Sequence, residues 1–270
     1  FSNKSNIPIN KVTLSFLNDY EKWMINSGKS LTTVGIYCRN IRSIFNEAIN
    51  TGSVKNELYP FGRGKYVIPN GNGIKKALTK ADIIRIKRYE PKNSIEEYSK
   101  DMWLFSYLAN GMNFTDIANL KQDNISDGFL MFIRSKTKRS TRSKPILIRI
   151  YLIEELKQII KKWGSNNREP LEYLFPILDS SMTIHQKVSK VELAIRSVNY
   201  HMNKIAKAIG ITKKVTTYSA RHTFSTVLKR SGAPIEYICE SLGHHSIMTT
   251  RHYLDSFEDE EKIKWSKKLL

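Results

Sequence analysis

The sequence predicts a mainly α-helical protein with two domains: a small helical domain, and a larger helical domain that contains a small antiparallel β-sheet. Three observations support this prediction. Apolar residues recur at helical spacing over most of the 270 residues. Two β-rich runs flank a short basic segment in the middle of the chain. A stretch rich in Pro and Gly interrupts the helical pattern near residue 60 and divides the chain.

The composition of the chain favours a polyanionic partner. Its 44 Lys and Arg residues against 25 Asp and Glu residues give a formal net charge of +19. The basic excess is interleaved with apolar and aromatic residues, as in a folded protein with basic faces. Cys38 and Cys239 suggest no disulfide framework, and no apolar run approaches the length of a membrane span. These features predict a protein of a reducing cytoplasm. The start at Phe1 suggests that a further segment precedes it.

Two helices are expected at the N-terminal end of the chain. The first contains apolar residues at helical spacing from Leu14 to Met24, and Gly28 provides its C-terminal stop. The second begins after Ser30, a good N-cap residue, and ends at Gly52. The residues expected on its buried face are Val34, Tyr37, Ile41, Ile44, Phe45 and Ala48.

The second helix also carries polar residues off this apolar stripe. A solvated face is the usual explanation, but the basic excess favours contact with a nucleic-acid backbone. From Tyr59 to Lys76 the helical pattern stops, and we place a linker at 69–76 between domains at 1–68 and 77–270. A solvated hinge explains the basic charges of this stretch almost as well as a connector lying along DNA. The residues expected to contact DNA in this half are Thr32, Thr33, Arg39, Arg42, Arg63 and Lys65.

The larger domain is expected to be built mostly of helices. One begins near Lys80, a buried one covers residues 102–109, and a short one begins at Thr115. Further helices are expected at 151–163 and 189–209, and the remainder of the chain is also expected to be helical. The apolar content of these segments is enough to build a second hydrophobic core.

A small sheet is expected inside this domain. Residues 129–133 and 145–150 are β-rich runs on either side of a basic turn, which predicts a hairpin or a small meander. Between Asp127 and Glu154 there are seven basic residues and no acid, whereas a hairpin that only solubilised the domain would mix both signs. The turn residues expected to contact DNA are Lys138, Arg139 and Arg142.

Five short motifs follow one another through the larger domain. They cover Gly111 to Ile117, Arg134 to Thr137, Tyr218 to Phe224, Leu242 to His244 and Thr250 to Tyr253. In this order and spacing they resemble the catalytic domain of the tyrosine recombinases, the phage integrase family, and look most like integrases of conjugative and other mobile elements in Bacteroidetes. The region before them resembles the SAM-like core-binding domain of that family. Each motif alone is weak, whereas five in order behind a basic helical module argue against a chance match.

The resemblance implies a site-specific DNA recombinase, an integrase that cuts and rejoins DNA through a 3′-phosphotyrosyl intermediate to integrate and excise a mobile element. The two domains would form a clamp around double-stranded attachment sites. Four copies would assemble on paired sites, with the terminal helix after Phe257 docked on a neighbouring copy. The resemblance also implies a bacterial, nucleoid-associated protein with no membrane contact, no metal and no other cofactor. Accessory DNA-bending proteins are candidate further partners.

The motifs assign a role to each catalytic candidate. Tyr253 stands where the family keeps its nucleophile, and a phenolic oxygen can attack phosphorus without consuming water. Arg221 would clamp the non-bridging oxygens, because its planar fork fits the charge of the transition state better than a point charge does. His244 follows a Gly at the end of a helix and would aim its imidazole at the phosphate. Lys136 would protonate the departing 5′-oxygen, with Lys138 as the competing candidate.

The sequence departs from the family pattern at two catalytic positions. Asn113 replaces the first catalytic Arg, and its amide can donate a hydrogen bond but supplies no charge. Arg134 and Lys136 would point to the same face of an expected strand, which makes Arg134 the first candidate to restore that charge. Tyr218 replaces a His three residues before Arg221, and a phenol with an ordinary pKa of about 10 is a poor base near neutrality.

Two other functions stay open from the sequence. The missing first Arg would fit a DNA-binding architectural protein without catalysis, although Tyr253, Arg221, His244 and Lys136 argue against that function. A type IB topoisomerase would share the phosphotyrosyl intermediate but would relax supercoils instead of exchanging strands. The core-binding module and the terminal helix favour the recombinase.

Overall fold

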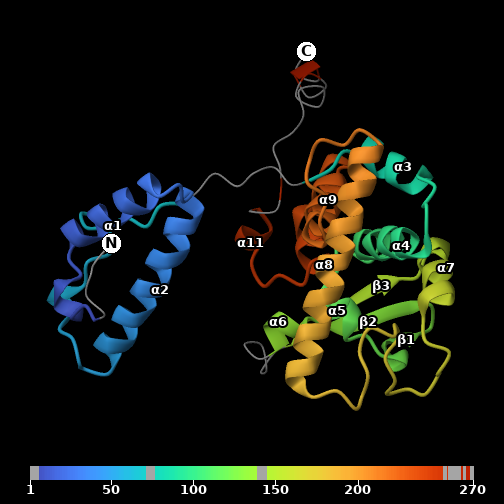
Figure 1. Ribbon diagram of the computed structural model, residues 1–270, viewed down its shortest axis with the longest axis horizontal. Helices are drawn as coiled ribbons and strands as arrows, with labels where there is room; N and C mark the ends of the chain where they lie inside the picture. The colour runs from blue at the N-terminus through green and yellow to red at the C-terminus, as the bar shows by residue number, and fades with distance from the viewer. Residues whose placement is uncertain are drawn as a thin grey trace. The chain divides into compact units, whose positions relative to one another are not determined.

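The chain folds into two compact units, each of which has its own hydrophobic core. A computed structural model describes residues 6–70, 77–138, 145–251 and the single positions 254, 263, 266 and 267. The units are Phe1–Ile74 and Lys75–Leu270. Both are mainly α-helical, and the second contains a small antiparallel sheet, as the sequence predicts (Figure 1).

Some residues singled out from the sequence lie outside the described part of the chain. They are Arg139 and Arg142 of the basic turn, the side chain of Lys138, Tyr253, and most of the segment from Phe257 onwards.

The first unit is built on two helices whose ends agree with the sequence. The hydroxyl of Ser30 accepts a hydrogen bond from the backbone N–H of Thr33 and caps the second helix. Gly28 and Gly52 follow the two helices with φ of 77° and 72°, a conformation that glycine adopts without strain. The elements are the short 3₁₀ helices η1 (Ile9–Lys11) and η2 (Asn56–Leu58) and the helices α1 (Leu14–Asn26) and α2 (Leu31–Asn50).

The core of the first unit differs in part from the predicted one. Tyr37 and Ile44 were predicted to be buried but are 51% and 62% exposed, whereas Cys38 is fully buried. The prediction was wrong because the stripe of α2 that packs on the core is narrower than the apolar pattern of the helix. Phe61 and Tyr66, which lie beyond the helices, complete this core with a bridge between their backbones. Residues up to Ile68 therefore pack against the first unit without forming a regular element.

In the second unit, α4 occupies the centre and packs against α7, α8 and α9 (Figure 1). The indole of Trp103, fully buried on α4, donates to the carbonyl oxygen of Thr216, 2.9 Å away, and so ties α4 to the start of α9. The helices α4 and α8 begin earlier than predicted. Their first turns hold few buried residues and so show no apolar periodicity in the sequence. The elements are α3 (Lys80–Arg88), α4 (Ser94–Leu108), α7 (Glu154–Trp163), α8 (Ile184–Ala208) and α9 (Thr217–Arg230).

The sheet of the second unit is a meander with the strand order β1-β2-β3, antiparallel throughout. The alternate residues Leu130 and Phe132 of β2 and Ile148 and Ile150 of β3 face the core. The prediction of a hairpin or small meander is confirmed, although β1 was not foreseen because it has only two residues. The strands are β1 (Ile125–Ser126), β2 (Phe129–Ile133) and β3 (Leu147–Tyr151).

Short helices fill the turns between these elements, and several candidate site residues lie in them or next to their ends. Within the described residues, no helix is both long and apolar enough to cross a membrane. The short elements are α5 (Phe114–Ala118), η3 (Gln122–Asn124), α6 (Ser135–Lys138), α10 (Ile235–Ser241) and α11 (Ile247–Arg251).

Candidate active site

Arg221 lies in the first turns of α9 with its side chain buried, 2% exposed. Its guanidinium donates to the carbonyl oxygens of Gly111, at 3.0 Å, and Leu242, and its Nη2 lies 3.1 Å from Nε2 of His244. Gly111 has a φ of 64°, and a Cβ there would lie 2.8 Å from the Cα of Arg221. The turn after α4 must therefore be a glycine turn for Arg221 to reach its carbonyl partner.

His244 follows the turn that ends α10. Gly243 has a φ of 61°, and a Cβ on it would lie 2.6 Å from Cδ1 of Ile148 in β3. The missing side chain lets the turn press against the sheet, so the imidazole, 8% exposed, is held beside Arg221. The sequence predicted this location for His244 from the preceding glycine.

Arg134 reaches the same turn from the end of β2. It is 6% exposed, its Nη1 donates to the carbonyl oxygen of Leu242 at 3.4 Å, and its Cδ would lie 3.0 Å from a Cβ on Gly243. Its Nε is buried and has no hydrogen-bond partner among the described residues. No ion pair formed within the described part of the chain includes Arg134.

Arg134, Arg221 and His244 together form what we call the arginine cluster, in which two positively charged side chains lie close together and are buried. Two guanidinium groups donate to the same carbonyl oxygen, that of Leu242, although like charges repel strongly at low dielectric. Burial, and then the charges of Arg221 and Arg134, lower the pKa of His244 from 6.5 to about 3, so the imidazole is neutral near pH 7. Such a cluster is suited to bind an anion with a planar, multidentate set of oxygen atoms, such as a phosphodiester.

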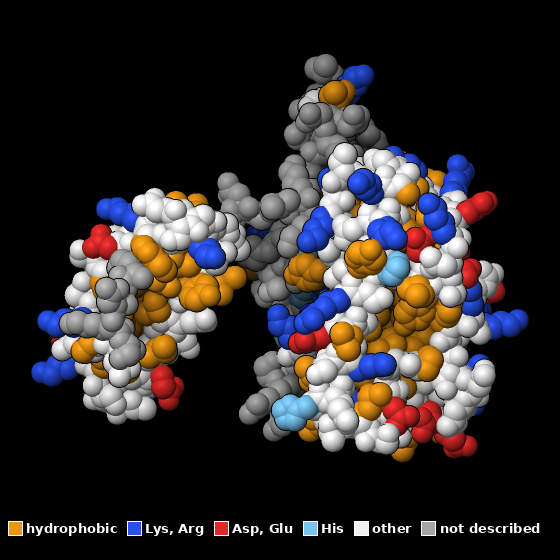
Figure 2. Space-filling view, in the orientation of Figure 1, with side chains coloured by type: hydrophobic (Ala, Val, Ile, Leu, Met, Phe, Trp, Pro, Cys, Tyr) orange, Lys and Arg blue, Asp and Glu red, His pale blue; other side chains and the backbone are white. Residues whose placement is uncertain are grey.

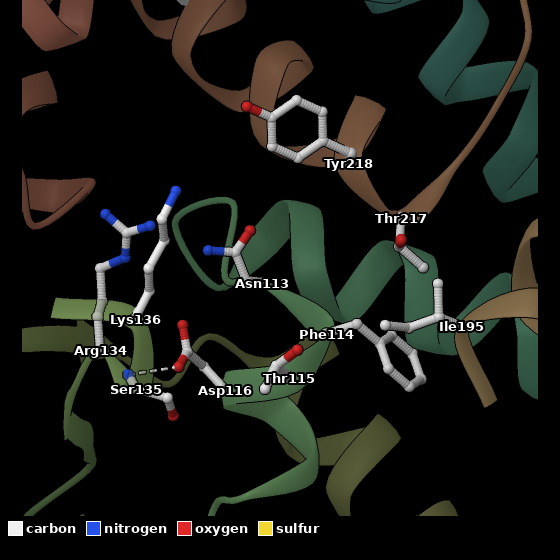
Figure 3. Close-up of a pocket in the computed structure, with 10 residues that line it drawn as sticks. All are labelled: Asn113, Phe114, Thr115, Asp116, Arg134, Ser135, Lys136, Ile195, Thr217 and Tyr218. Atoms are coloured by element: carbon white, nitrogen blue, oxygen red, sulfur yellow. Dashed lines mark hydrogen bonds between the residues drawn. The ribbon is translucent and has the colours of Figure 1, made fainter. Parts of the chain in front are cut away.

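A cavity of about 510 Å³ opens beside the arginine cluster. Figure 3 shows the side chains of Arg134 and Lys136 reaching in the same direction, with the amide of Asn113 beside them and Tyr218 on the far side of the space. Arg221 and His244 do not belong to the lining, so Arg134 is the residue that connects the cluster to the cavity. The lining residues are Asn113, Phe114, Thr115, Asp116, Arg134, Ser135, Lys136, Ile195, Thr217 and Tyr218.

Arg134 and Lys136 do not lie on one strand, contrary to the prediction. They were predicted to share a strand and hence a face, but β2 ends at Ile133 and Lys136 lies in α6. Arg134 is buried whereas Lys136 is exposed. Their side chains nevertheless line the same cavity, because the backbone N–H of Ser135 donates to Oδ1 of the buried Asp116 at 2.8 Å and fixes the turn between them (Figure 3).

Asn113 and Tyr218 occupy the two catalytic positions at which the sequence departs from the pattern of the family that it resembles. Asn113 precedes α5 as its N-cap residue, but its side chain makes no capping bond and instead lines the cavity. Tyr218 is 41% exposed on the first turn of α9, and its ring meets that of His222 edge to face at 4.8 Å. Both side chains can present a polar group to a ligand in the cavity, and neither carries a charge there.

The first unit presents several of the residues predicted to contact DNA. Arg39 and Arg42 of α2 and the turn residues Arg63 and Lys65 are exposed, as is Thr32, whereas Thr33 is half-buried at the helix start. Basic side chains are spread over the visible face of each unit (Figure 2). Among the described residues, no group of three or more His, Cys, Asp and Glu side chains could hold a metal ion.

The structure also identifies contributors that sequence reasoning missed. The carbonyl oxygen of Leu242 joins the two arginines, and the hydroxyl of Thr250 lies 2.9 Å from Nδ1 of His244. No sequence signal separates Thr250 from the adjacent Thr249, because only the packing of α11 decides which hydroxyl faces inward.

The lowered pKa of His244 predicts a pH-dependent stability. An unfolded chain with an ordinary His pKa of about 6.5 binds more protons than the folded chain down to a pH of about 3. The contribution of the neutral imidazole is therefore fully present above pH 6.5 and is lost as the pH falls towards 3. We expect His244→Gln to flatten the fall of the unfolding free energy between pH 7 and pH 4 by up to about 1.4 kcal/mol per pH unit. Urea titrations followed by circular dichroism measure this, and parallel profiles for both proteins would contradict it.

The fold and the site define a two-unit helical protein, in which a small helical unit precedes a larger one with a buried arginine cluster suited to bind an anion. Family comparison agrees: residues 76–260 match the phage integrase family and residues 1–68 match the phage integrase SAM-like domain. The chain belongs to the phage integrase family. It is a tyrosine-type site-specific recombinase, an enzyme that breaks and rejoins DNA.

Individual relatives are distant in sequence. The tyrosine recombinase XerC of Thermodesulfovibrio yellowstonii is 24% identical over 94% of this chain and 81% of its own length. The XerC of Leptospira interrogans is 27% identical over 69% of this chain, which spans only 61% of that relative.

Solved structures share the fold at low sequence identity. The Tn1549 transposon integrase in complex with transposon right end DNA has a TM-score of 0.68 at 16% identity, with 99% of this chain and 89% of that chain covered. A lambda integrase tetramer bound to a Holliday junction has a TM-score of 0.62 at 17% identity, over 95% of this chain and 69% of that one.

Proposed function

We propose that this recombinase is the integrase of a mobile element and acts on double-stranded attachment sites through Tyr253. The observation that carries the proposal is the arginine cluster, in which two guanidinium groups donate to one carbonyl oxygen and a neutral imidazole lies beside one of them. The cluster adjoins a cavity lined by Lys136, so a phosphodiester bound there meets both donors and an acid.

The proposed reaction is a transesterification that needs only side chains. The phenolic oxygen of Tyr253 attacks phosphorus, and the P–O bond to the tyrosine forms while the bond to the 5′-oxygen breaks. The phenolic proton passes to Nε2 of His244, whose basicity rises once the phosphodiester charge offsets the two guanidinium groups. Lys136 gives a proton to the departing 5′-oxygen. Attack by another 5′-hydroxyl reverses these steps and rejoins the strand.

Arg134 is proposed to replace the charge of the missing first Arg. Arg134 is buried beside Arg221, both donate to the oxygen of Leu242, and Arg134 also lines the cavity next to Asn113. Its buried Nε has no partner among the described residues and can donate to a phosphate oxygen. Asn113 adds a neutral hydrogen bond from its amide, and Tyr218 adds one from its hydroxyl.

The first unit and the basic turn are proposed to hold the DNA backbone. Thr32, Arg39 and Arg42 project from α2, and Arg63 and Lys65 lie on the turn that follows the helices, all of them exposed. Contacts of this kind position a protein on DNA without reading its sequence. The assignment also extends to Thr33 and to Lys138, Arg139 and Arg142, whose side chains lie outside the described part of the chain.

The assembly is proposed from the relatives. The Tn1549 integrase was solved on transposon right end DNA and the lambda integrase as a tetramer on a Holliday junction. We infer a tetramer of this chain on paired attachment sites, in the bacterial cytoplasm and in association with the nucleoid. Accessory DNA-bending proteins are proposed as further partners.

Covalent trapping tests the proposed function. The protein is incubated without added metal with labelled, nicked duplexes that cover the ends of its parent element, and the products are separated on a denaturing gel. A slow band is expected from the parent protein and none from Tyr253→Phe, because only a phenolic oxygen can form the link.

The outcomes separate the remaining functions. Binding in a native gel without a covalent band would favour an architectural DNA-binding protein. Relaxation of a supercoiled plasmid that lacks any element sequence would favour a type IB topoisomerase, because such an enzyme needs no paired sites.

A further inference from the structure

The hydrogen-bond network of His244 extends beyond the arginine cluster to Thr250. The hydroxyl oxygen of Thr250 lies 2.9 Å from Nδ1 of His244, and Thr250 is fully buried on α11. The backbone of His244 is held as well, because its carbonyl oxygen accepts from the thiol of Cys239 at 3.2 Å. Among the described residues, Thr250 thus contacts Nδ1 of the imidazole and Arg221 contacts Nε2.

The chemistry of Arg221 decides which nitrogen carries the proton. A guanidinium group can only donate hydrogen bonds, so Nε2 of His244, 3.1 Å from Nη2, must accept. A neutral imidazole has one donor and one acceptor, so the hydrogen must be on Nδ1. The Nδ1–H then donates to the hydroxyl oxygen of Thr250. The opposite tautomer would place two N–H donors against one another inside the protein.

The surroundings keep the imidazole neutral. Among the described residues, the charged groups that lower its pKa are Arg221 from α9 and Arg134 from the end of β2, and both oppose a positive charge on the ring. Burial opposes it further, and Thr250 from α11 is an uncharged partner. A neutral imidazole carries its single N–H proton on either Nδ1 or Nε2, and the hydrogen-bonding neighbours determine which of these two tautomers is populated.

We propose that Thr250 is a positioning residue that accepts the Nδ1–H of His244 and, together with Arg221, holds the imidazole in the Nδ1–H tautomer, with the lone pair of Nε2 directed towards Arg221. The inference rests on the proposed function for its catalytic consequence, since Nε2 is the atom proposed to accept the phenolic proton. It does not depend on that function for the tautomer itself. A hydrogen-bonding neighbour commonly fixes the tautomer of a histidine in this way, and for metal-bound histidines the loss of such a neighbour costs about 10- to 100-fold in activity.

Nuclear magnetic resonance tests the tautomer directly. The 270-residue protein is labelled with ¹⁵N-histidine, and long-range proton–nitrogen correlations are recorded near pH 7, with His244→Gln identifying the signal. The parent and Thr250→Ser should both show a protonated Nδ1 and an unprotonated Nε2, because serine keeps the hydroxyl. Thr250→Val should show a smaller population of the Nδ1–H form than the parent, because the buried Nδ1–H then loses its acceptor and only Arg221 still favours that tautomer. A protonated Nε2 in the parent would overturn the proposal.

Single-turnover cleavage of the nicked duplex tests the consequence. Thr250→Val should form the covalent complex about 10- to 100-fold more slowly at unchanged affinity for DNA, and Thr250→Ser should remain near the parent rate. Thr249→Val is the matched control, because Thr249 is exposed on the same helix and makes no bond to His244. Equal rates for Thr250→Val and Thr249→Val would overturn the catalytic part of the proposal.

The two measurements fail in distinguishable ways. If the parent forms no covalent complex, the proposed function is wrong, and the spectra of the parent and Thr250→Ser still decide the tautomer. If Thr250→Val is slow but keeps the parent tautomer, Thr250 acts on packing alone, and the positioning role is overturned. The parent and Thr250→Ser carry the test even if Thr250→Val does not fold.

Discussion

Arg221→Lys is expected to slow formation of the covalent complex by about 10²- to 10³-fold while the affinity for DNA stays within about an order of magnitude. Lys keeps the charge but not the planar fork, so it can hold only one oxygen where Arg221 presents two Nη groups. Hydrogen bonds to the carbonyl oxygens of Gly111 and Leu242 already hold the two Nη groups in place. The guanidinium group therefore needs no reorganisation during the reaction. Single-turnover cleavage measures the rate, and a native gel measures binding.

Arg221→Lys can also lower the stability of the fold, and this effect must be separated from the slower cleavage. Because Arg221 is 2% exposed and joins the turn after α4 to the turn after α10, a lower melting temperature is expected as well. Circular dichroism at the assay temperature must show a folded protein. Arg149→Lys serves as the matched control, because Arg149 is exposed on β3 and stacks on Phe129, 4.2 Å from the ring centre. A folded Arg221→Lys that cleaves at the parent rate would remove Arg221 from the phosphate site.

Arg134→Ala is expected to slow cleavage by about 10²-fold, because it removes the charge proposed to replace the missing first Arg. The cavity beside it is lined by Asn113, so a guanidinium restored at that position should reach the same phosphate. We therefore expect Asn113→Arg, combined with Arg134→Ala, to recover at least about tenfold of the lost rate. The measurement is again single-turnover formation of the covalent complex.

Controls distinguish compensation from a general loss of charge. Arg149→Ala removes the same charge from the outer face of the sheet and should leave the rate near that of the parent. Parent-like cleavage by Arg134→Ala would show that Arg134 does not compensate for Asn113. A slow double variant, with no recovery from Asn113→Arg, would show that Arg134 supports packing around Leu242 and supplies no replaceable charge.

Local features of the fold could be predicted because local residues cause them. Ser30 caps α2 through a bond to the backbone only three residues later, and Gly28 and Gly52 lie where the helices end. The strands alternate between core and solvent, so their β-rich pattern was visible. The starts of α4 and α8 were missed, because exposed first turns lack the apolar periodicity on which the prediction depends.

The candidate site was predictable only as a set of residues. The motifs singled out Arg221, His244 and Lys136 from their order along the chain, and the structure places Arg221 beside His244. The predicted strand face shared by Arg134 and Lys136 was wrong, since the chain turns into α6 directly after Arg134. The two residues line one cavity for a tertiary reason, the bond from Ser135 to Asp116.

The sequence by itself determined the helical class, the two-part organisation and the basic character, and it singled out the candidate reactive side chains. Each of these depends on composition, on periodicity or on groups a few residues apart. Only the tertiary structure decided that Arg134 and Arg221 meet at the carbonyl oxygen of Leu242, and that Thr250 and not Thr249 bonds to His244. These contacts join elements distant in sequence, so their geometry depends on how whole helices and strands pack, which no local pattern specifies.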